Sequence, residues 1–365
     1  MRIAIFHELQ RGGARRAVNE FAKHLKKNNK IDLYTVDGED NKDEKDFFDN
    51  VFFYKFIPRK WSGGNWKIRL YKDTIELYNI YKLHKEIARI INKKNYDLAF
   101  IHPSKFTQTP FILRFLKIPK IYYCEETLRI AYESQFELTD KIPFHKRMYD
   151  KLTKFVRKKI DKKNISSADT VLANSKFTRK NIRVAYGIES KVSYLGVDTD
   201  FFKPKENKKD IDILYIGSKD QIDGYNLLRS ALRLIPKKIS VKYHLTGEEW
   251  ISDMDLRRLY NRSKIVVCLA KNEPLGLIPL EAAACSVPVI ALDNGGYKET
   301  VINEITGYLI PRNKKILSQK LLYLLRAKDK LSQMGKDSRI HVKKRWEWNI
   351  LTIYLEEIFK KRIAN

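Results

Sequence analysis

The stretch Asn272–Ile290, NEPLGLIPLEAAACSVPVI, most constrains what this chain can fold into. It is preceded by Lys264–Ala270 (KIVVCLA), an apolar, β-branched run that predicts a strand buried on both faces. The motif then predicts a turn, a short helix over Leu277–Cys285 and a second buried strand over Val287–Leu292. In such α/β sheets a ligand binds at the carboxyl ends of the strands, facing a helix N-terminus.

Two carboxylates, Glu273 and Glu281, stand eight positions apart around that point. A carboxylate accepts several hydrogen bonds and can hold two neighbouring hydroxyls of a sugar. The first-turn amides of Gly276, Leu277 and Ile278 are donors suited to phosphate oxygens. Hydroxyls together with phosphate indicate a nucleotide sugar. The spacing of the two glutamates alone would carry no weight, because solvated helix faces produce it often.

The segment EPLGLIPLE resembles the E-x7-E signature of retaining glycosyltransferases of family 4, which have the GT-B fold. The resemblance implies an α/β fold class, with two Rossmann-like domains facing across a cleft. It also implies that Glu273 contacts the transferred sugar and stabilises charge as its bond breaks, while Glu281 holds the ribose of the nucleotide. The resemblance is strong over 252–311, fair over 165–202, and moderate near 12–28 and 121–133.

The length of 365 residues favours two domains. The polar segment Lys203–Asp210 (KPKENKKD) is the expected linker. We therefore predict an acceptor-side domain over 1–205 and a nucleotide-sugar-binding domain over 206–345. By resemblance, the last helix, within 346–365, packs back on the first domain.

A glycine pair follows the first predicted strand, Arg2–Phe6, and precedes a helix over about Ala14–Lys27. This order lets a backbone approach a ligand at a helix N-terminus. Gly12 and Gly13 also resemble the glycine loop that opens the acceptor-side domain of the family, although a tight turn would have the same composition. His102, at the predicted end of a later strand, is a candidate site residue or a structural histidine.

Two segments of the chain depart from the family pattern. After the strand IPKIYYC, relatives often have a histidine beside the transferred sugar, and this chain has Glu125 there, while Arg129 keeps the pattern. In the loop Ser218–Gly224, relatives usually place two basic residues that bind the donor diphosphate. Here those positions hold Ser218 and Asp223.

The remaining candidates for the donor site are Lys219, Gly295 and Gly296. Lys219 could replace one of the missing basic residues, and an aspartate at position 223 would repel a diphosphate. The glycine pair in DNGGYKET could direct its amides to the phosphates. Two helix caps are also predicted, one at Asn174-Ser175 and one at Ser252.

Composition indicates which partners and which compartment are expected. The three cysteines have no metal-ligand spacing, and no apolar run is long enough to cross a membrane, so we expect a cytoplasmic protein with reduced thiols. The formal charge is +28, and its densest stretch, Lys146–Lys163, has nine basic and two acidic residues with apolar residues at helical spacing. Such a helix could lie on an anionic membrane face or turn its apolar side to the core. No motif supports nucleic-acid binding.

The sequence thus predicts transfer of a sugar from a nucleotide diphosphate sugar to a hydroxyl of a saccharide, glycolipid or other glycoconjugate. The resemblance implies retention at the anomeric carbon without metal or other cofactor. Two alternatives stay open because of Glu125, Ser218 and Asp223. The first is a binding or assembly subunit that kept the fold and lost efficient turnover. The second is an epimerase or hydrolase acting on nucleotide sugars.

Overall fold

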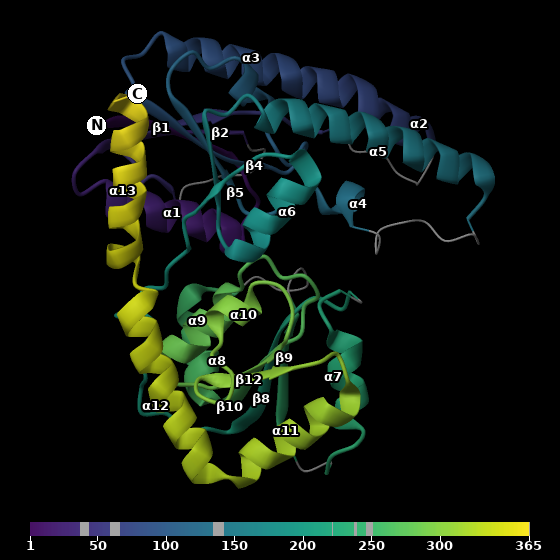
Figure 1. Ribbon diagram of the computed structural model, residues 1–365, viewed down its shortest axis with the longest axis vertical. Coiled ribbons are helices and arrows are strands. Elements are labelled where there is room, and N and C mark those ends of the chain that lie inside the picture. The colour runs from purple at the N-terminus through teal and green to yellow at the C-terminus, as the bar shows by residue number, and fades with distance from the viewer. Residues whose placement is uncertain are drawn as a thin grey trace. The chain divides into compact units, whose positions relative to one another are not determined.

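The computed structural model describes residues 1–36, 44–58, 66–133, 142–220, 222–236, 239–245 and 251–364. Its contacts divide the chain into two units (Figure 1). Unit 1 comprises 1–174, 178–193 and 352–365, and unit 2 comprises 175–177 and 194–351. The boundary at 193/194 precedes the expected linker, because residues after Ser193 already pack within unit 2. Val197, for example, donates its amide to the carbonyl of Trp346 at 2.8 Å.

Unit 1 is built on a parallel sheet with strand order β3-β2-β1-β4-β5-β6-β7. The burial of β1 and β4 on both faces explains their near-continuous apolar sequences. The strands are β1 (Arg2–Glu8), β2 (Lys30–Val36), β3 (Asn50–Tyr54), β4 (Leu98–Ser104), β5 (Lys120–Cys124), β6 (Thr170–Ala173) and β7 (Lys191–Val192).

Helices cover this sheet in Figure 1. They are α1 (Gly13–Leu25), α2 (Trp66–Tyr71), the π-helix η2 (Lys72–Glu76), α3 (Leu77–Asn92), the 3₁₀ helix η3 (Phe111–Arg114), α4 (Arg129–Tyr132), α5 (Phe144–Ile165) and α6 (Lys176–Tyr186). The π-helix interrupts what the sequence predicts as one α-helix over Ile68–Lys93. The hydroxyl of Thr74 donates to the carbonyl of Leu70 at 2.6 Å in this region.

Unit 2 has a smaller parallel sheet with strand order β12-β11-β10-β8-β9. Its strands are β8 (Ile211–Gly217), β9 (Val241–Leu245), β10 (Ser263–Cys268), β11 (Val289–Leu292) and β12 (Gly307–Ile310). The helices are α7 (Tyr225–Leu232), α8 (Asp253–Arg262), α9 (Leu277–Ala284), α10 (Tyr297–Thr300), α11 (Lys314–Arg326) and α12 (Lys328–Arg345), and the final helix α13 (Trp348–Ala364) begins in unit 2 and continues into unit 1.

The end of α13 belongs to unit 1. Phe359 is fully buried and its ring lies 5.0 Å from that of Phe100 on β4. The side-chain amide of Asn29 donates to Glu356 at 2.9 Å. The last helix therefore completes the core of unit 1.

Both sheets have a switch point where the strand order reverses. In unit 1 it lies between β1 and β4, and in unit 2 between β8 and β10. The loops that leave such neighbouring strands diverge to opposite faces and leave room for a ligand at the carboxyl edge. These two edges are therefore where candidate site residues are sought.

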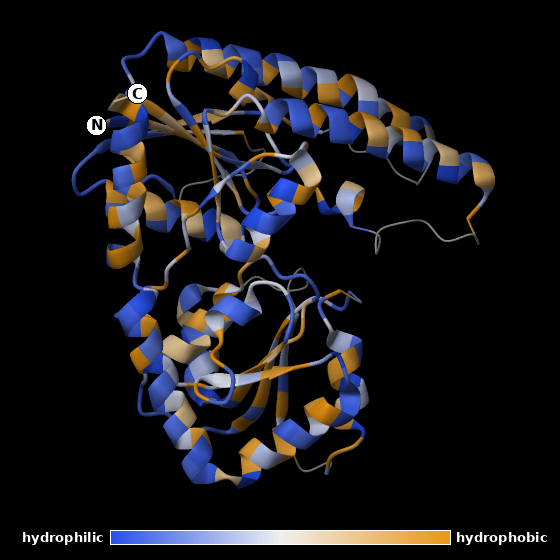
Figure 2. Ribbon diagram, in the orientation of Figure 1, coloured by the Kyte–Doolittle hydropathy of each residue, from blue (hydrophilic) through white to orange (hydrophobic). Residues whose placement is uncertain are grey.

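Helix α5 does not turn its apolar side to the core, so the core-facing interpretation is wrong for most of its length. Figure 2 shows hydrophobic and hydrophilic residues alternating along it. Its apolar residues on one side are exposed, with relative accessibilities of 42% to 68%: Phe144, Met148, Leu152, Phe155 and Val156. Only Asp161, Asn164 and Ile165 are buried.

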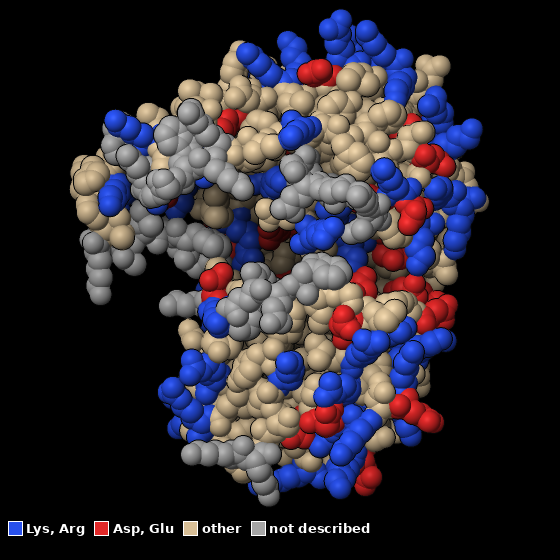
Figure 3. Space-filling view, turned by 180° about the vertical axis from the view of Figure 1, so that it is seen from behind, with Lys and Arg blue, Asp and Glu red and all other residues tan. Residues whose placement is uncertain are grey.

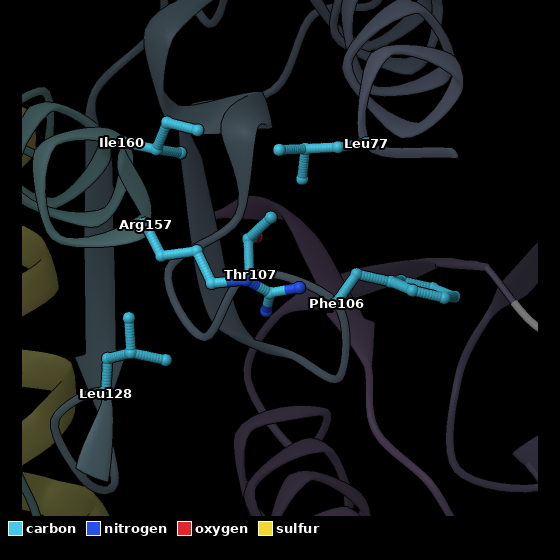
Figure 4. A pocket seen from close by; sticks show the side chains of 6 residues that line it. All are labelled: Leu77, Phe106, Thr107, Leu128, Arg157 and Ile160. Atoms are coloured by element: carbon cyan, nitrogen blue, oxygen red, sulfur yellow. The ribbon is translucent and has the colours of Figure 1, made fainter. Parts of the chain in front are cut away.

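Polar contacts hold α5 to the rest of unit 1. Arg157 forms an ion pair with Asp73 of η2 at 2.5 Å, and the hydroxyl of Tyr149 donates to the same carboxylate at 3.0 Å. Next to this ion pair lies a small pocket, in which the side chain of Arg157 reaches toward Thr107 (Figure 4). The pocket is otherwise lined by Leu77, Phe106, Leu128 and Ile160.

Candidate active site

The carboxyl edge of the unit 2 sheet brings together the loops after β8 and β10. The backbone amide of Lys271 donates to the carbonyl of Ile222 at 2.8 Å, which ties the two loops together. Gly224 has φ +84° and lies so close to Leu269 that a Cβ would come within 2.4 Å of its carbonyl oxygen. The loop after β8 and the loop after β10, which both carry predicted donor-site residues, therefore pack against each other.

The loop that carries Glu273 is held in place by the glycine pair after β11. The amide of Gly296 donates to the carbonyl of Glu273 at 2.7 Å. Gly295 has φ +63°, and a Cβ on Gly296 would lie 2.4 Å from the Cα of Leu275. The glycine pair therefore buttresses the Glu273 loop, and the Gly296 amide is engaged there rather than directed to a phosphate as the sequence suggested.

Glu273 itself is half-buried, whereas Glu281 on α9 is buried. A carboxylate oxygen of Glu281 accepts a hydrogen bond from the hydroxyl of Tyr260, on α8, at 2.7 Å. This partner fixes the glutamate side chain from behind. No local pattern in the sequence connects these two residues.

The first turn of α9 offers amides at the same edge. Gly276 has φ +88° and precedes the helix, and a Cβ there would meet the ring of Tyr297 at 2.7 Å. Among the described residues, the amides of Gly276, Leu277 and Ile278 donate to no backbone carbonyl. These donors have the disposition of an anion site at a helix N-terminus.

Ser218 and Asp223 bind each other within the β8–α7 loop. The carboxylate of Asp223 accepts from the Ser218 amide at 2.9 Å and from its hydroxyl at 2.5 Å. The Asp223 carboxylate therefore stabilises the conformation of this loop. In the sequence only its charge toward a diphosphate is apparent. Lys219 lies in this loop beside Ser218, and Gln221 falls outside the described residues.

Glu299 supplies acceptors for backbone amides at the start of α6, next to the cap that the sequence predicts at Asn174-Ser175. The Glu299 carboxylate accepts from the amides of Lys176 and Phe177, both at 2.9 Å, and from the hydroxyl of Tyr194 at 2.8 Å. The Ser175 hydroxyl donates to the carbonyl of Pro274 at 2.6 Å, and the cap at Asn174-Ser175 stays a prediction. The second predicted cap is confirmed, since the Ser252 side chain accepts from the Asp255 amide at 3.1 Å.

Unit 1 carries the remaining candidates at its own carboxyl edge. Gly12 precedes α1, Gly13 begins it, and a Cβ on Gly12 would meet no atom within 4 Å. His102 is fully buried inside β4, which extends to Ser104 rather than ending at the histidine. Glu125 directly follows β5, and its carboxylate lies 4.0 Å from the imidazole of His102.

Arg129 begins α4 and is paired with acidic neighbours. Its guanidinium donates to Glu133 at 2.8 Å and lies 3.8 Å from Glu126. The structure thus places Arg129 in a local ion-pair cluster. Its expected role at the acceptor or phosphate side stays a prediction.

Sequence reasoning missed a buried ionic group at the end of β1. His7 contacts Glu44 at 3.0 Å, and Arg15 donates to the same oxygen at 2.6 Å. Burial opposes ionisation of Glu44, but His7 and Arg15 outweigh it and lower its pKa. Nearby, His84 lies 3.0 Å from Glu8, both fully buried. The only signal for this group was the HE pair at the end of the first strand.

No arrangement of His, Cys, Asp and Glu suited to a metal ion occurs within the part of the chain that the structure describes. The three cysteines are buried and unpaired with one another. Lys and Arg side chains are spread widely over the face shown in Figure 3.

Comparison with known proteins identifies both halves of the chain. A model described as Glycosyltransferase Family 4 matches residues 11–201, and one described as Glycosyl transferases group 1 matches residues 244–341. The alpha-1,3/1,6-mannosyltransferase of Schizosaccharomyces pombe is 29% identical over 282 residues, which is 73% of this chain and 49% of that protein. Spore coat protein SA of Bacillus subtilis is 28% identical over 161 residues, 41% of each. The chain thus spans about half the length of these curated relatives or less.

Solved structures have the same fold over the whole chain. Sucrose-phosphate synthase from Thermosynechococcus elongatus superposes with a TM-score of 0.76 at 18% identity, covering 100% of this chain and 99% of that one. HepE of Anabaena, solved in complex with UDP and glucose, gives a TM-score of 0.74 at 17% identity, covering 99% of each. Both expectations of the fold, an α/β class and GT-B architecture, are confirmed by this likeness.

Proposed function

The chain belongs to glycosyltransferase family 4, and on that basis we propose that it transfers a sugar from a nucleotide diphosphate sugar to a hydroxyl of a saccharide or lipid-linked acceptor. The observation that carries the proposal is the Glu273 loop and α9 at the switch point of unit 2. There a half-buried carboxylate, a buried carboxylate and uncommitted helix amides lie within one short segment. This combination suits a sugar, a ribose and a diphosphate.

In this proposal Glu273 orients the sugar and stabilises positive charge as the glycosidic bond to the diphosphate breaks. Glu281, held by Tyr260, accepts the ribose hydroxyls. The amides of Gly276, Leu277 and Ile278 bind phosphate oxygens, assisted by Lys219. The glycine pair Gly295–Gly296 contributes by fixing the Glu273 loop.

We further propose retention of the anomeric configuration and no need for a metal ion, both on the resemblance to the family. The leaving diphosphate would help to deprotonate the acceptor on the same face of the sugar. The arrangement then requires no pair of carboxylates acting as acid and base. Product anomeric configuration read by NMR tests the first point, and activity after chelation tests the second.

The function is tested by measuring thermal stability with UDP, GDP, ADP and TDP and then assaying the matching sugars. A ligand at a hundred times its dissociation constant adds about 2.7 kcal/mol to the free energy of unfolding. A shift with one base, followed by transfer that Glu273→Ala abolishes without unfolding the protein, supports the proposal. Absence of a shift with every nucleotide would favour the binding or assembly subunit, which has lost the donor site.

The exposed side of α5 supports a second proposal, association with the anionic cytoplasmic face of a membrane. Phe144, Met148, Leu152 and Phe155 follow one another at spacings of three and four, so they share one side of the helix. Lysines accompany them, including Lys159, whose ammonium lies 4.6 Å from the Phe155 ring. The charge of +28 favours anionic lipid. No described helix has both the length and the apolar composition to cross a bilayer.

Sedimentation with vesicles tests this association. Phosphatidylcholine vesicles containing phosphatidylglycerol should bind the protein, and vesicles of phosphatidylcholine alone should bind it weakly. Leu152→Ser and Phe155→Ser should reduce binding, whereas Val184→Ser, at an apolar residue that is 78% exposed on α6, should not. Equal sedimentation with both vesicle types would remove the proposal.

A further inference from the structure

The carboxyl group of Glu125 lies in surroundings that do not suit a negative charge. Its side chain is 13% exposed. Its Oε1 atom is buried and has no hydrogen-bond partner among the described residues. The imidazole Nδ1 of His102 is 4.0 Å away, which is too long for a hydrogen bond.

Aromatic rings surround the histidine behind Glu125. The ring centroids of Phe100, Tyr123 and Phe21 lie 4.4, 5.4 and 5.9 Å from that of His102. His102 is fully buried, and within the described part of the chain neither of its ring nitrogens has a partner. A protonated imidazole would be poorly solvated here, so burial lowers the pKa of His102 well below its usual value, and the charge of His7 adds to this.

Arg129, a basic residue close to Glu125 in the sequence, forms its ion pairs with other carboxylates. Arg129 is bound to Glu133 and lies beside Glu126. Burial, and then the charge of Glu126, raise the pKa of the Glu125 carboxyl to about 8. Among the described residues, its other neighbours are uncharged at neutral pH: Tyr122, Tyr123 and Cys124 on β5, and Thr178 on α6, whose hydroxyl donates to the backbone carbonyl of Glu125 at 3.3 Å.

We propose that Glu125 works as an uncharged carboxylic acid that donates a hydrogen bond to an oxygen of the bound substrate, with neutral His102 as the positioning residue behind it. This inference rests on the proposed glycosyl transfer and deepens it. The proton stays on Glu125, so no bond is made or broken. The ligand atom is a hydrogen-bond acceptor, either a sugar hydroxyl or a phosphate oxygen.

A glutamate is ordinarily an anion at neutral pH, and the proposal assigns Glu125 the opposite protonation state. An imidazole and a protonated carboxyl can both donate a hydrogen bond, whereas a carboxylate can only accept. A buried polar group without a partner is costly, and a substrate oxygen at this carboxyl edge would supply that partner. The substitution of the family's usual histidine by Glu125 thereby keeps a donor in place.

The kinetic test compares Glu125→Gln with Glu125→Ala over a range of pH. The amide of glutamine keeps a donor at nearly the same place and does not titrate. We expect Glu125→Gln to retain transfer within about fivefold at neutral pH, and Glu125→Ala to lose about 30-fold or more. Wild-type kcat/KM should fall about tenfold per pH unit above pH 8, and Glu125→Gln should lack this fall.

Two results would overturn the proposal: a Glu125→Gln variant that is folded and as inactive as Glu125→Ala, or a wild-type rate that is unchanged well above pH 8. To distinguish a phosphate oxygen from a sugar hydroxyl as the acceptor, the nucleoside diphosphate without a sugar is titrated into the protein by calorimetry. Weaker binding of the diphosphate by Glu125→Ala assigns a phosphate oxygen. Unchanged binding, with loss of transfer, assigns a sugar hydroxyl.

A spectroscopic measurement makes the inference independent of the proposed function. Infrared difference spectra between pH 6 and pH 9 should contain the carbonyl stretch of a protonated carboxylic acid that disappears in Glu125→Gln. Glu189→Gln, at a side chain that is 76% exposed, is the matched control and should leave that band unchanged. If transfer fails but this band is present, the proposed function is wrong and the uncharged acid stands. If the band is missing, the uncharged acid is wrong.

Discussion

Asp223 accepts two hydrogen bonds from Ser218, one from its amide and one from its hydroxyl, and so closes the loop after β8 upon itself. Hydrogen bonds to a charged group contribute about 1.5–3 kcal/mol each before the exposure of this loop is considered. We expect Asp223→Ala to lower the free energy of unfolding by about 1 kcal/mol in urea titrations. Asp220→Ala in the same loop is the control and should change it less.

The same variant decides whether the Asp223 charge repels the donor. If repulsion were its main effect, Asp223→Ala would bind nucleotide diphosphates more tightly. Because the carboxylate positions the Ser218 amide, we expect calorimetry to show equal or weaker binding. An affinity gain of about tenfold, or 1.4 kcal/mol, would restore the repulsion interpretation.

Gly296→Ala should disable the Glu273 loop. A Cβ at this position would lie 2.4 Å from both the Leu275 Cα and the Pro274 carbonyl oxygen, so the loop has to move. Overpacking of this kind costs about 1–3 kcal/mol. Transfer activity should fall together with the melting temperature, while Lys298→Ala, at a 58% exposed side chain two residues away, should retain both. A fully active Gly296→Ala variant would show that the loop position is not critical.

Tyr260→Phe tests whether the hydrogen bond from Tyr260 positions the carboxylate of Glu281. The change removes one hydroxyl and leaves a buried carboxylate oxygen without that donor, at a cost of about 1–3 kcal/mol. Nucleotide affinity should weaken if the glutamate orients the ribose. Tyr323→Phe, at a 48% exposed tyrosine, is the comparison. Unchanged affinity in Tyr260→Phe would separate Glu281 from nucleotide binding.

Asp161→Ala should be the most destabilising change in α5. Asp161 is fully buried, accepts from the Thr109 amide at 3.1 Å and accepts from the Tyr186 hydroxyl at 2.6 Å. Its loss leaves two buried donors unsatisfied, which costs about 2–4 kcal/mol in total. Asp150→Ala, which removes the 2.8 Å ion pair with Lys154 on the same helix, should cost less than about 1 kcal/mol. Guanidinium denaturation compares the two.

The raised pKa of the Glu125 carboxyl should make the free energy of unfolding depend on pH. Its carboxyl has a pKa of about 8 in the folded protein, above the usual value near 4.5. The folded state therefore holds a proton that the unfolded state has released, and stability is lost as the pH rises from about 4.5 to about 8. Each unit of this displacement corresponds to about 1.4 kcal/mol. The free energy of unfolding of Glu125→Gln relative to wild type should rise across this range, and a constant difference would refute the prediction.

The sequence predicts the elements well where one local signal decides them. Apolar, β-branched runs such as Ile211–Gly217 became buried parallel strands, and Asp253–Arg262 became a helix with the expected serine cap. Contacts between residues far apart in the chain have no local signal. Glu299 caps amides more than a hundred positions away, and Tyr260 supports Glu281 across two elements.

The contacts of other site residues are hidden from the sequence for the same reason. The sequence does not show that Asp223 binds Ser218, and it leaves open whether α5 turns its apolar side to the core, because composition does not show which partner a side chain has. The raised pKa of the Glu125 carboxyl likewise depends on surroundings that only the fold supplies. Motif spacing predicts which loops carry the candidate site. The hydrogen-bond partners of the residues in those loops come from the three-dimensional structure.

The packing of Phe359 against Phe100 has a consequence for synthesis on the ribosome. The strands of unit 1 are translated first, but the helical segment that completes their core leaves the ribosome after the whole of unit 2. Until residues 352–365 have been synthesised, the core of nascent unit 1 exposes apolar surface, and we expect chaperones to bind it. Stalled chains that end before residue 352 should therefore be captured by a trigger-factor-like holdase and sensitive to protease, and chains extended past Phe359 should be released and resistant.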